Sequence, residues 1–209
     1  MNNGFFISLE GGEGAGKSTQ HRRIVEWFSR HGKRVVEARE PGGTPISERI
    51  RQLLLDTKTA GLCATSELLL MFAARSQLLQ QMIRPALENG DVVVCDRFTD
   101  ASYAYQGGGR QLGSEAVDTL AQLVHGDLQP DLTLLFDVSI EQGMTRVAGR
   151  GAADRFEVES IEFFQRVRQA YLEQAAKAPQ RFRVIDAGQD QDQVWVQVQS
   201  ILEASLETI

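Results

Sequence analysis

A glycine-rich segment near the start of the chain has the residue types and spacing of a phosphate-binding loop. Residues 11–18 read GGEGAGKS, which fits the pattern G-x-x-x-x-G-K-[ST] at every position. Glycines let consecutive backbone N–H groups turn towards phosphate oxygens, and a helix that begins at Lys17 adds the positive end of its dipole. Lys17 would supply a charge for the β- and γ-phosphates. The predicted ATP-binding residues are Gly11, Gly12, Glu13, Gly14, Ala15, Gly16, Lys17, Ser18 and Thr19.

An acidic residue at the end of a second apolar run fits a metal site. Asp96 follows the residues DVVVC, which read as a buried strand. We predict that Asp96 holds Mg²⁺ through water and that the Ser18 hydroxyl is the second metal-binding group. A simple cap at the end of the strand is the alternative interpretation of Asp96.

Arginines gather near glycines and near the predicted strand ends. Arginine suits phosphate because its planar fork donates two parallel hydrogen bonds. For any one of them alone a surface role is the better explanation, but together they fit a phosphate clamp. The set is Arg39, Arg75, Arg97, Arg110, Arg146, Arg150 and Arg155.

The nature of the acceptor decides which further groups are needed. A phosphate acceptor is largely ionised at neutral pH, because its second pKa is about 6, so it needs no general base. A hydroxyl acceptor would need a carboxylate base, and Glu13 or Glu40 could serve, so a nucleoside kinase is an alternative. A non-catalytic nucleotide-binding dimer is a second alternative. The presence of Lys17, Ser18 and Asp96 favours catalysis, and no N-K-x-D segment indicates a GTPase.

Apolar runs alternate with helical patterns, which is typical of an α/β domain with a parallel sheet covered on both faces. The predicted strands are residues 5–10, 34–39, 91–96, 131–138 and 183–186. The predicted helices are residues 17–31, 46–55, 66–89, 114–125 (with Ser114 as N-cap and Glu115 in the first turn), 140–147, 161–177 and 192–206. We expect one domain over residues 1–209, with irregular segments at 42–45, 57–65, 107–113 and 149–159.

Composition narrows the classes of partner. The chain has 209 residues, of which 42% are hydrophobic, and 22 basic against 28 acidic residues give a net charge of −6. This balance argues against nucleic acid as a partner. The start of the sequence has neither a signal peptide nor an apolar span, so we expect a cytoplasmic protein without membrane contact. Cys63 and Cys95 are expected to be buried free thiols.

Four motifs together resemble those of bacterial thymidylate kinases. They are LEGGEGAGKST at residues 9–19, REPGGT at 39–44, DRFTDASYAYQGGGR at 96–110 and GRGAADRFE at 149–157. The resemblance extends from about residue 5 to 186. It implies a P-loop nucleoside monophosphate kinase fold, with a five-stranded parallel sheet and an arginine-bearing lid at about residues 146–159. It also implies a homodimer that transfers the γ-phosphoryl group of Mg-ATP to thymidine 5′-monophosphate (dTMP), giving the diphosphate for dTTP synthesis.

The resemblance also assigns roles around the acceptor. Phe72 would stack on thymine, and Arg75 would reach its O4 edge. The other residues implied are Arg97 and Arg39 at the acceptor phosphate, Glu13 near the 3′-hydroxyl, Tyr105 under the deoxyribose, Ser102 and Gln106 along the nucleoside pocket, and Glu40 and Pro41 in the turn around it.

Two features of the motifs place the chain within this resemblance. The phosphate loop has no arginine at its variable positions, which resembles the members that use lid arginines. Arg150 is then the first candidate for stabilising charge on the transferred group, and Arg155 is the second. Ala101 stands where the family usually has serine, so no role is assigned there.

Overall fold

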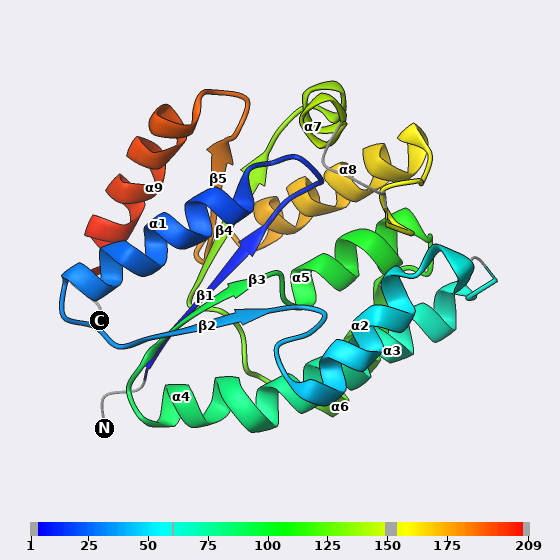
Figure 1. Cartoon of the computed structure of the whole chain (residues 1–209), viewed down its shortest axis with the longest axis horizontal. Coiled ribbons are helices and arrows are strands. Elements are labelled where there is room, and N and C mark those ends of the chain that lie inside the picture. The colour runs from blue at the N-terminus through cyan, green and yellow to red at the C-terminus, as the bar shows by residue number, and fades with distance from the viewer. Residues whose placement is uncertain (1–3, 60, 149–153, 207–209) are drawn as a thin grey trace.

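A five-stranded parallel sheet forms the centre of the molecule, in the order β2-β3-β1-β4-β5 (Figure 1). The computed structural model describes residues 4–59, 61–148 and 154–206. The strands are β1 (Phe5–Glu10), β2 (Val35–Arg39), β3 (Val92–Asp96), β4 (Leu132–Asp137) and β5 (Phe182–Asp186). The predicted fold class is confirmed, and each predicted strand is present within one residue at either end.

Helices connect the strands and cover both faces of the sheet. The α-helices are α1 (Lys17–Arg30), α2 (Pro45–Leu55), α3 (Ala64–Leu78), α4 (Arg84–Glu88), α5 (Thr99–Ser102), α6 (Ser114–Val124), α7 (Ile140–Val147), α8 (Ile161–Lys177) and α9 (Gln191–Leu206). Three short segments of other helical types are the 3₁₀ turn η1 (Thr57–Thr59) and the π-helical η2 (Leu79–Ile83) and η3 (Tyr103–Gly109).

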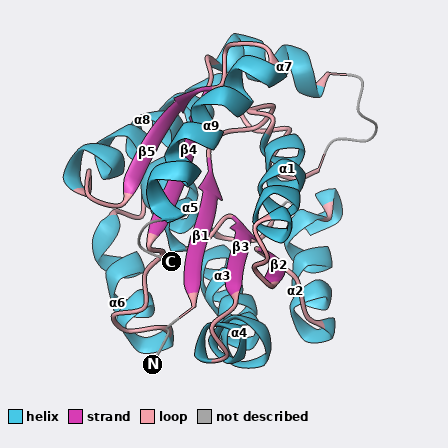
Figure 2. Cartoon of the chain, turned by 90° about the vertical axis from the view of Figure 1, so that its left-hand side faces the viewer, coloured by secondary structure: helices cyan, strands magenta, loops and turns pink. Residues whose placement is uncertain are grey.

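Side-chain alternation along the strands builds two cores. Ile7 and Leu9 of β1 face the layer formed by α1 and α9, whereas Phe6 faces the layer that contains η2 and α4. Figure 2 shows the sheet between these layers. The central strands β1, β3 and β4 are buried on both faces and are largely apolar in sequence, whereas the edge strands β2 and β5 also carry exposed charged residues.

The helix predicted over residues 66–89 is not one regular helix. It begins at Ala64, passes through the π-helical η2 and ends as α4 at Glu88. Pro85 lies in the first turn of α4 and has no backbone N–H to donate to the preceding turn. The backbone hydrogen bonds of the helix accommodate this missing donor in the wider π-helical turn directly before Pro85.

Two further expectations need correction. Ser114 is the first residue of α6, and Gly113, with φ 78°, is the N-cap, although Glu115 does lie in the first turn. Cys63 is exposed and Cys95 is buried; both are free.

The segment that follows β3 is helical as far as Gly109, although its glycines led us to expect a loop at residues 107–113; residues 110–113 are irregular as predicted. A Cβ at Gly109 would lie 2.6 Å from the Phe163 ring, and one at Gly108 would lie 2.7 Å from the Ala170 Cβ. Both neighbours belong to α8, so the glycines serve close packing of η3 against α8. In the part of the chain that the structure describes, no helix is long and apolar enough to span a bilayer.

Candidate active site

The phosphate loop joins β1 to α1 at the carboxyl edge of the sheet. Lys17 is buried, and its Nζ donates to the carbonyl oxygens of Gly11, at 3.2 Å, and Gly12, at 3.4 Å. Burial and the neighbouring Arg97 guanidinium lower the pKa of Lys17. The amine is therefore held across the loop by weak backbone contacts that a phosphate oxygen can replace.

The loop rests directly on α7. Gly14 has φ 70°, and a Cβ there would strike the backbone carbonyl of Gly143. A Cβ at Gly143 would lie 2.5 Å from the Glu13 carbonyl oxygen. Arg146, one turn further along α7, donates to the carbonyl oxygens of Gly14, at 3.4 Å, and Ala187, at 2.8 Å. The conformation of the loop thus depends on contacts to α7 and to the segment after β5.

Asp96 and Ser18 lie along the same cavity and could hold a divalent metal ion. Asp96 ends β3 beside the start of the loop, and its Oδ1 is buried without a hydrogen-bond partner among the described residues. The Ser18 residue is exposed to the cavity. Mg²⁺ prefers few protein ligands together with water and phosphate oxygens, and no cluster of three His, Cys, Asp or Glu residues occurs in the described ranges.

Arg97 sits at the centre of the site with a left-handed backbone, at φ 70°. Its guanidinium donates to the Gly11 carbonyl at 3.0 Å, to the Tyr171 hydroxyl at 3.2 Å and to Glu13 Oε1 at 2.8 Å. Tyr105 also donates to Glu13 Oε1, at 2.8 Å, and the Arg97 guanidinium lies 4.7 Å from its ring centre. A positive φ is costly for a residue with a side chain, and here these contacts hold Arg97 next to the phosphate loop.

Arg75 comes from α3 and is 2% exposed. Its Nε donates to Glu40 Oε2 at 2.7 Å, and its Nη2 donates to the Ser102 hydroxyl at 3.1 Å. Burial raises the pKa of Glu40, although Arg75 beside it acts in the opposite direction. The Arg75 Nη1 is buried and has no partner in the described part of the chain, so it is a donor available to a ligand in the cavity.

The remaining predicted acceptor residues also lie along this cavity. Arg39 is half exposed, and its Nη2 donates to Glu48 at 2.8 Å. The peptide bond between Glu40 and Pro41 is cis. Gln106 is 1% exposed and donates from its amide to the Glu67 carboxylate at 2.8 Å. The structure therefore brings Arg39, Glu40, Pro41, Gln106 and the groups described above to one cavity.

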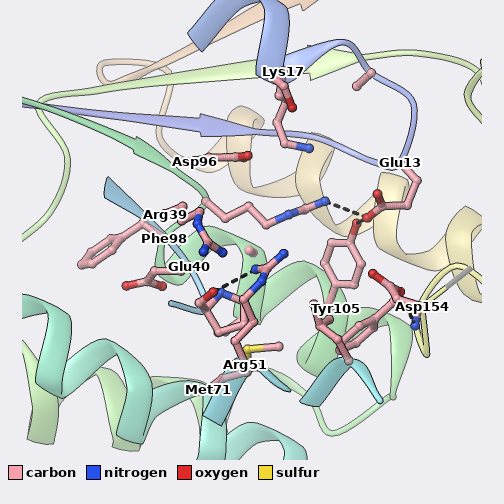
Figure 3. A pocket seen from close by; sticks show the side chains of 18 of the residues that line it. Glu13, Lys17, Arg39, Glu40, Arg51, Met71, Asp96, Phe98, Tyr105 and Asp154 are labelled. Atoms are coloured by element: carbon pink, nitrogen blue, oxygen red, sulfur yellow. Dashed lines mark hydrogen bonds and ion pairs between the residues drawn. The ribbon is translucent and has the colours of Figure 1, made fainter. Parts of the chain in front are cut away.

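Phe72 lies elsewhere, and its predicted stacking role is not supported by this placement. It is 2% exposed and packs with Leu68, Val117 and Ala121 between α3 and α6. Met71 lines the cavity in its place (Figure 3). Residues four apart share a helix face, so Met71 is in line with Arg75, and this spacing was the signal that the sequence offered.

The arginines of the predicted lid segment give a second correction. Arg155 is 6% exposed, donates from Nε to the Leu54 carbonyl at 2.7 Å and pairs with Glu67 at 2.7 Å. It points away from the cavity, whereas its neighbours Asp154 and Phe156 line it. Arg150 lies outside the described residues.

Several cavity residues were not identified from the sequence. Arg51 of α2 donates to the Pro41 carbonyl at 2.8 Å, and burial together with Arg39 lowers its pKa. Leu55, four residues further along, also lines the cavity. The sequence could have indicated Arg51 because residues four apart lie on the same face of a helix. The other residues missed are Met71, Phe98, Asp154 and Phe156.

Comparison with known proteins places this geometry in a family. The family model described as thymidylate kinase matches residues 9–198. The chain belongs to the thymidylate kinase family. A thymidylate kinase of Ectopseudomonas mendocina is 57% identical over 204 residues, which cover 98% of this chain and 97% of the relative. One of Pseudomonas syringae pv. tomato is 52% identical over the same shares of the two chains.

A solved structure supports the same assignment. The crystal structure of thymidylate kinase from Ehrlichia chaffeensis superposes with a TM-score of 0.78 at 35% sequence identity, and the match covers 96% of this chain and 99% of that one. As a thymidylate kinase family member, the chain has the P-loop kinase fold expected from its motifs. The cavity described above occupies the carboxyl edge of that fold.

Proposed function

We propose that this chain transfers the γ-phosphoryl group of ATP to dTMP, producing the diphosphate, at the cavity between the phosphate loop and α3. The observation that carries this proposal is the arrangement along one cavity. Lys17, Asp96 and Arg97 lie at one end, and the buried, unpartnered Nη1 of Arg75 lies towards the other. The first set of residues suits the phosphates of the donor and of the acceptor. The Arg75 Nη1 suits a carbonyl oxygen of the acceptor base. The names of the relatives are consistent with this assignment.

On the donor side, the backbone N–H groups of residues 11–18 and the Lys17 amine would bind the β- and γ-phosphates. Ser18 and Asp96 are the residues that would hold a divalent cation, which we propose to be Mg²⁺. When bound, that ion would neutralise phosphate charge. The unpartnered Oδ1 of Asp96 supports this role.

On the acceptor side, Arg97 and Arg39 would orient the dTMP phosphate. Bringing two anions together is the main obstacle, and fixed guanidinium groups lower it without a proton transfer. Glu13 is engaged by Arg97 and Tyr105, which suits a group that positions the sugar rather than a base for a hydroxyl acceptor. Tyr105 and Ser102 would border the deoxyribose and the base.

Arg150 remains our candidate for stabilising charge on the transferred group. The proposal rests on one observation from the sequence and one from the structure: no arginine occurs in the phosphate loop, and Arg155 is paired with Glu67. Arginines in this role are worth about 10³–10⁵-fold in kcat, so Arg150→Ala should lower kcat steeply with little change in the KM for dTMP. Steady-state kinetics within a few-fold of wild type would remove Arg150 from the role.

The decisive experiment offers the purified chain Mg-ATP with each nucleoside and each nucleoside monophosphate. We expect dTMP to be phosphorylated far better than thymidine. Preference for thymidine would establish the hydroxyl acceptor instead. ATP binding without transfer to any acceptor would leave the non-catalytic alternative.

We also propose a cytoplasmic homodimer. Large apolar side chains that are at least 45% exposed occur on α2, at Ile46 and Leu53, on α3, at Leu69, and on α6, at Leu123. A second copy could cover such side chains. Light scattering at working concentrations that gave a monomer mass would contradict this part of the proposal.

A further inference from the structure

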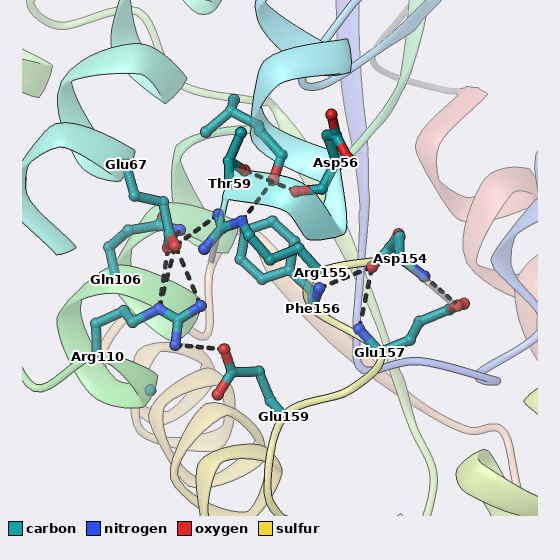
Figure 4. A network of polar contacts seen from close by, with 12 residues as sticks. Asp56, Thr59, Glu67, Gln106, Arg110, Asp154, Arg155, Phe156, Glu157 and Glu159 are labelled. Carbon is teal, nitrogen blue, oxygen red and sulfur yellow. Dashed lines mark hydrogen bonds and ion pairs between the residues drawn. The ribbon is translucent and has the colours of Figure 1, made fainter. Parts of the chain in front are cut away.

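Glu67, in the first turn of α3, is a fully buried carboxylate with no direct place along the cavity. Its Oε2 pairs with Arg110 at 3.1 Å and with Arg155 at 2.7 Å. Its Oε1 accepts from the Gln106 amide nitrogen at 2.8 Å. Figure 4 shows these side chains converging on Glu67 from two separate parts of the chain, Gln106 and Arg110 from one segment and Arg155 from another. Two guanidinium groups balance its charge, so the pairing with Gln106 is not needed for neutralisation.

The contact between Glu67 and Gln106 fixes which end of the amide faces which way. An ionised carboxylate only accepts hydrogen bonds, so the Gln106 NH₂ group must point at Glu67. The two ends of an amide look alike in shape, and the network around it decides the orientation. Oε1 of Gln106 is then left for the cavity, and no described residue donates to it.

We propose that Glu67 is a positioning residue for acceptor selection: it holds Gln106 so that a carbonyl oxygen, and not an NH₂ group, meets the base. A pyrimidine that carries N–H at position 3, as thymine and uracil do, would donate to that oxygen. Cytosine has an acceptor at position 3 and would face it with a repulsive lone pair. This inference rests on the proposed function, because it assumes that the base of the acceptor occupies the cavity next to Gln106.

A polar pocket gains its selectivity from the cost of mismatched groups. A buried acceptor that meets another acceptor costs more than the matched hydrogen bond gains, and sites of this kind discriminate strongly. Glu67 makes the mismatch unavoidable for cytosine, because rotating the Gln106 amide would turn its oxygen against the carboxylate.

The central variant is Glu67→Gln, which keeps the side-chain size. The oxygen of the new amide would face Arg110 and Arg155, and its NH₂ would face Gln106, which then turns its own NH₂ into the cavity. We expect the preference for dTMP over dCMP, measured as the ratio of kcat/KM, to fall about tenfold or more. The KM for dTMP should rise while the KM for ATP stays unchanged. Arg75 is the same in both proteins, so its reading of position 4 cancels in this comparison.

A swapped pair separates positioning from support of the fold. In the double variant Glu67→Gln with Gln106→Glu, the amide donates to a carboxylate that again offers oxygen to the base. We expect dTMP preference to recover towards wild type. In Gln106→Glu alone, two carboxylates face each other, so both dTMP binding and thermal stability should fall.

Glu159→Gln is the matched control, since Glu159 pairs with Arg110 at 2.6 Å without touching Gln106. It should leave the ratio of dTMP to dCMP unchanged. If Glu67→Gln and the control both leave that ratio within twofold of wild type while the melting temperature falls, Glu67 is merely structural and the proposal is wrong.

A measurement on the unmodified protein decides the question even where variants fail to fold. The N3-methyl analogue of dTMP lacks the donor, and we expect its kcat/KM to be at least about 100-fold lower than that of dTMP. Comparable turnover of the two compounds would overturn the proposal. Absence of any transfer to dTMP by the wild-type protein would instead contradict the proposed function itself.

Discussion

The two ends of the cavity are built in different ways. At the phosphate end, the groups that would meet the donor are backbone amides and one lysine from eight consecutive residues. Within the described ranges, the hydrogen bonds of the Lys17 amine go to carbonyl oxygens at 3.2 and 3.4 Å. At the nucleoside end, side chains from distant segments hold one another through short charged pairs, as Arg75 does with Glu40 and Arg155 with Glu67. The donor-binding loop is built from local backbone, whereas the nucleoside end, like Arg97 beside the loop, is an assembled network of side chains.

This contrast predicts different consequences of mutation. Groups at the phosphate end can be removed without opening the core, so the losses should appear in turnover. Groups at the nucleoside end support both binding and folding, because removing one member of a buried charged pair leaves the other uncompensated.

The largest expected effect comes from Lys17→Ala. Loss of this preorganised charge should lower kcat by about 10²–10³-fold or more. The melting temperature should stay near that of wild type, because the lysine makes only weak contacts to carbonyl oxygens. Kinetics together with thermal unfolding check this, and a large fall in stability would contradict the contrast between the two ends.

Phe72→Ala should act mainly on the fold. Removing a buried aromatic side chain costs about 3–5 kcal/mol of unfolding free energy. Because Phe72 packs between α3 and α6 and not along the cavity, the KM for dTMP of the folded fraction should change little. Urea denaturation measures the first quantity. A large rise in the KM for dTMP with unchanged stability would instead support the predicted stacking of Phe72 on the thymine base.

Met71→Ala is the matched variant, one position earlier on α3. Met71 lines the cavity and is only partly buried, so the loss of apolar contact should raise the KM for dTMP about fivefold, which corresponds to about 1 kcal/mol. Stability should fall less than for Phe72→Ala. Equal effects of the two substitutions on KM would mean that the helix face is wrongly assigned.

The last prediction concerns the pH dependence of stability. His125 is 3% exposed, lies 2.9 Å from the Thr99 hydroxyl, and has its pKa lowered to about 4 by burial and by Arg75. In the unfolded chain the histidine pKa is about 6.5, so between about pH 6.5 and 4 the unfolded chain binds a proton at His125 and the folded chain does not. Unfolding free energy should therefore fall as the pH drops from about 6.5 towards about 4.

The matched variant for this prediction is His125→Gln, which can still hydrogen-bond to Thr99 but does not titrate. Its urea unfolding free energy should decline less over the same pH range than that of wild type. Parallel declines would assign the acid sensitivity to other groups.

The sequence was most informative where structure depends on neighbours along the chain. The phosphate loop and the central strands could be predicted because a contiguous glycine pattern and largely apolar runs carry their own signal. Phe72 and Arg155 could not be placed, because their positions depend on partners far along the chain: Val117 and Ala121 for the first, Glu67 for the second. The helix at η3 was missed because its glycines serve α8 and not a turn.

The contact between Gly14 and Gly143 has one more consequence. The backbones of the phosphate loop and α7 approach so closely at these two glycines that a side chain at either position would force the two elements apart. The chain leaves α7 at Val147, close to where the arginine-bearing segment begins. A single added methyl at position 143 would therefore displace the phosphate loop from α7, and with it the start of the segment that follows α7. It would do so without contacting either substrate.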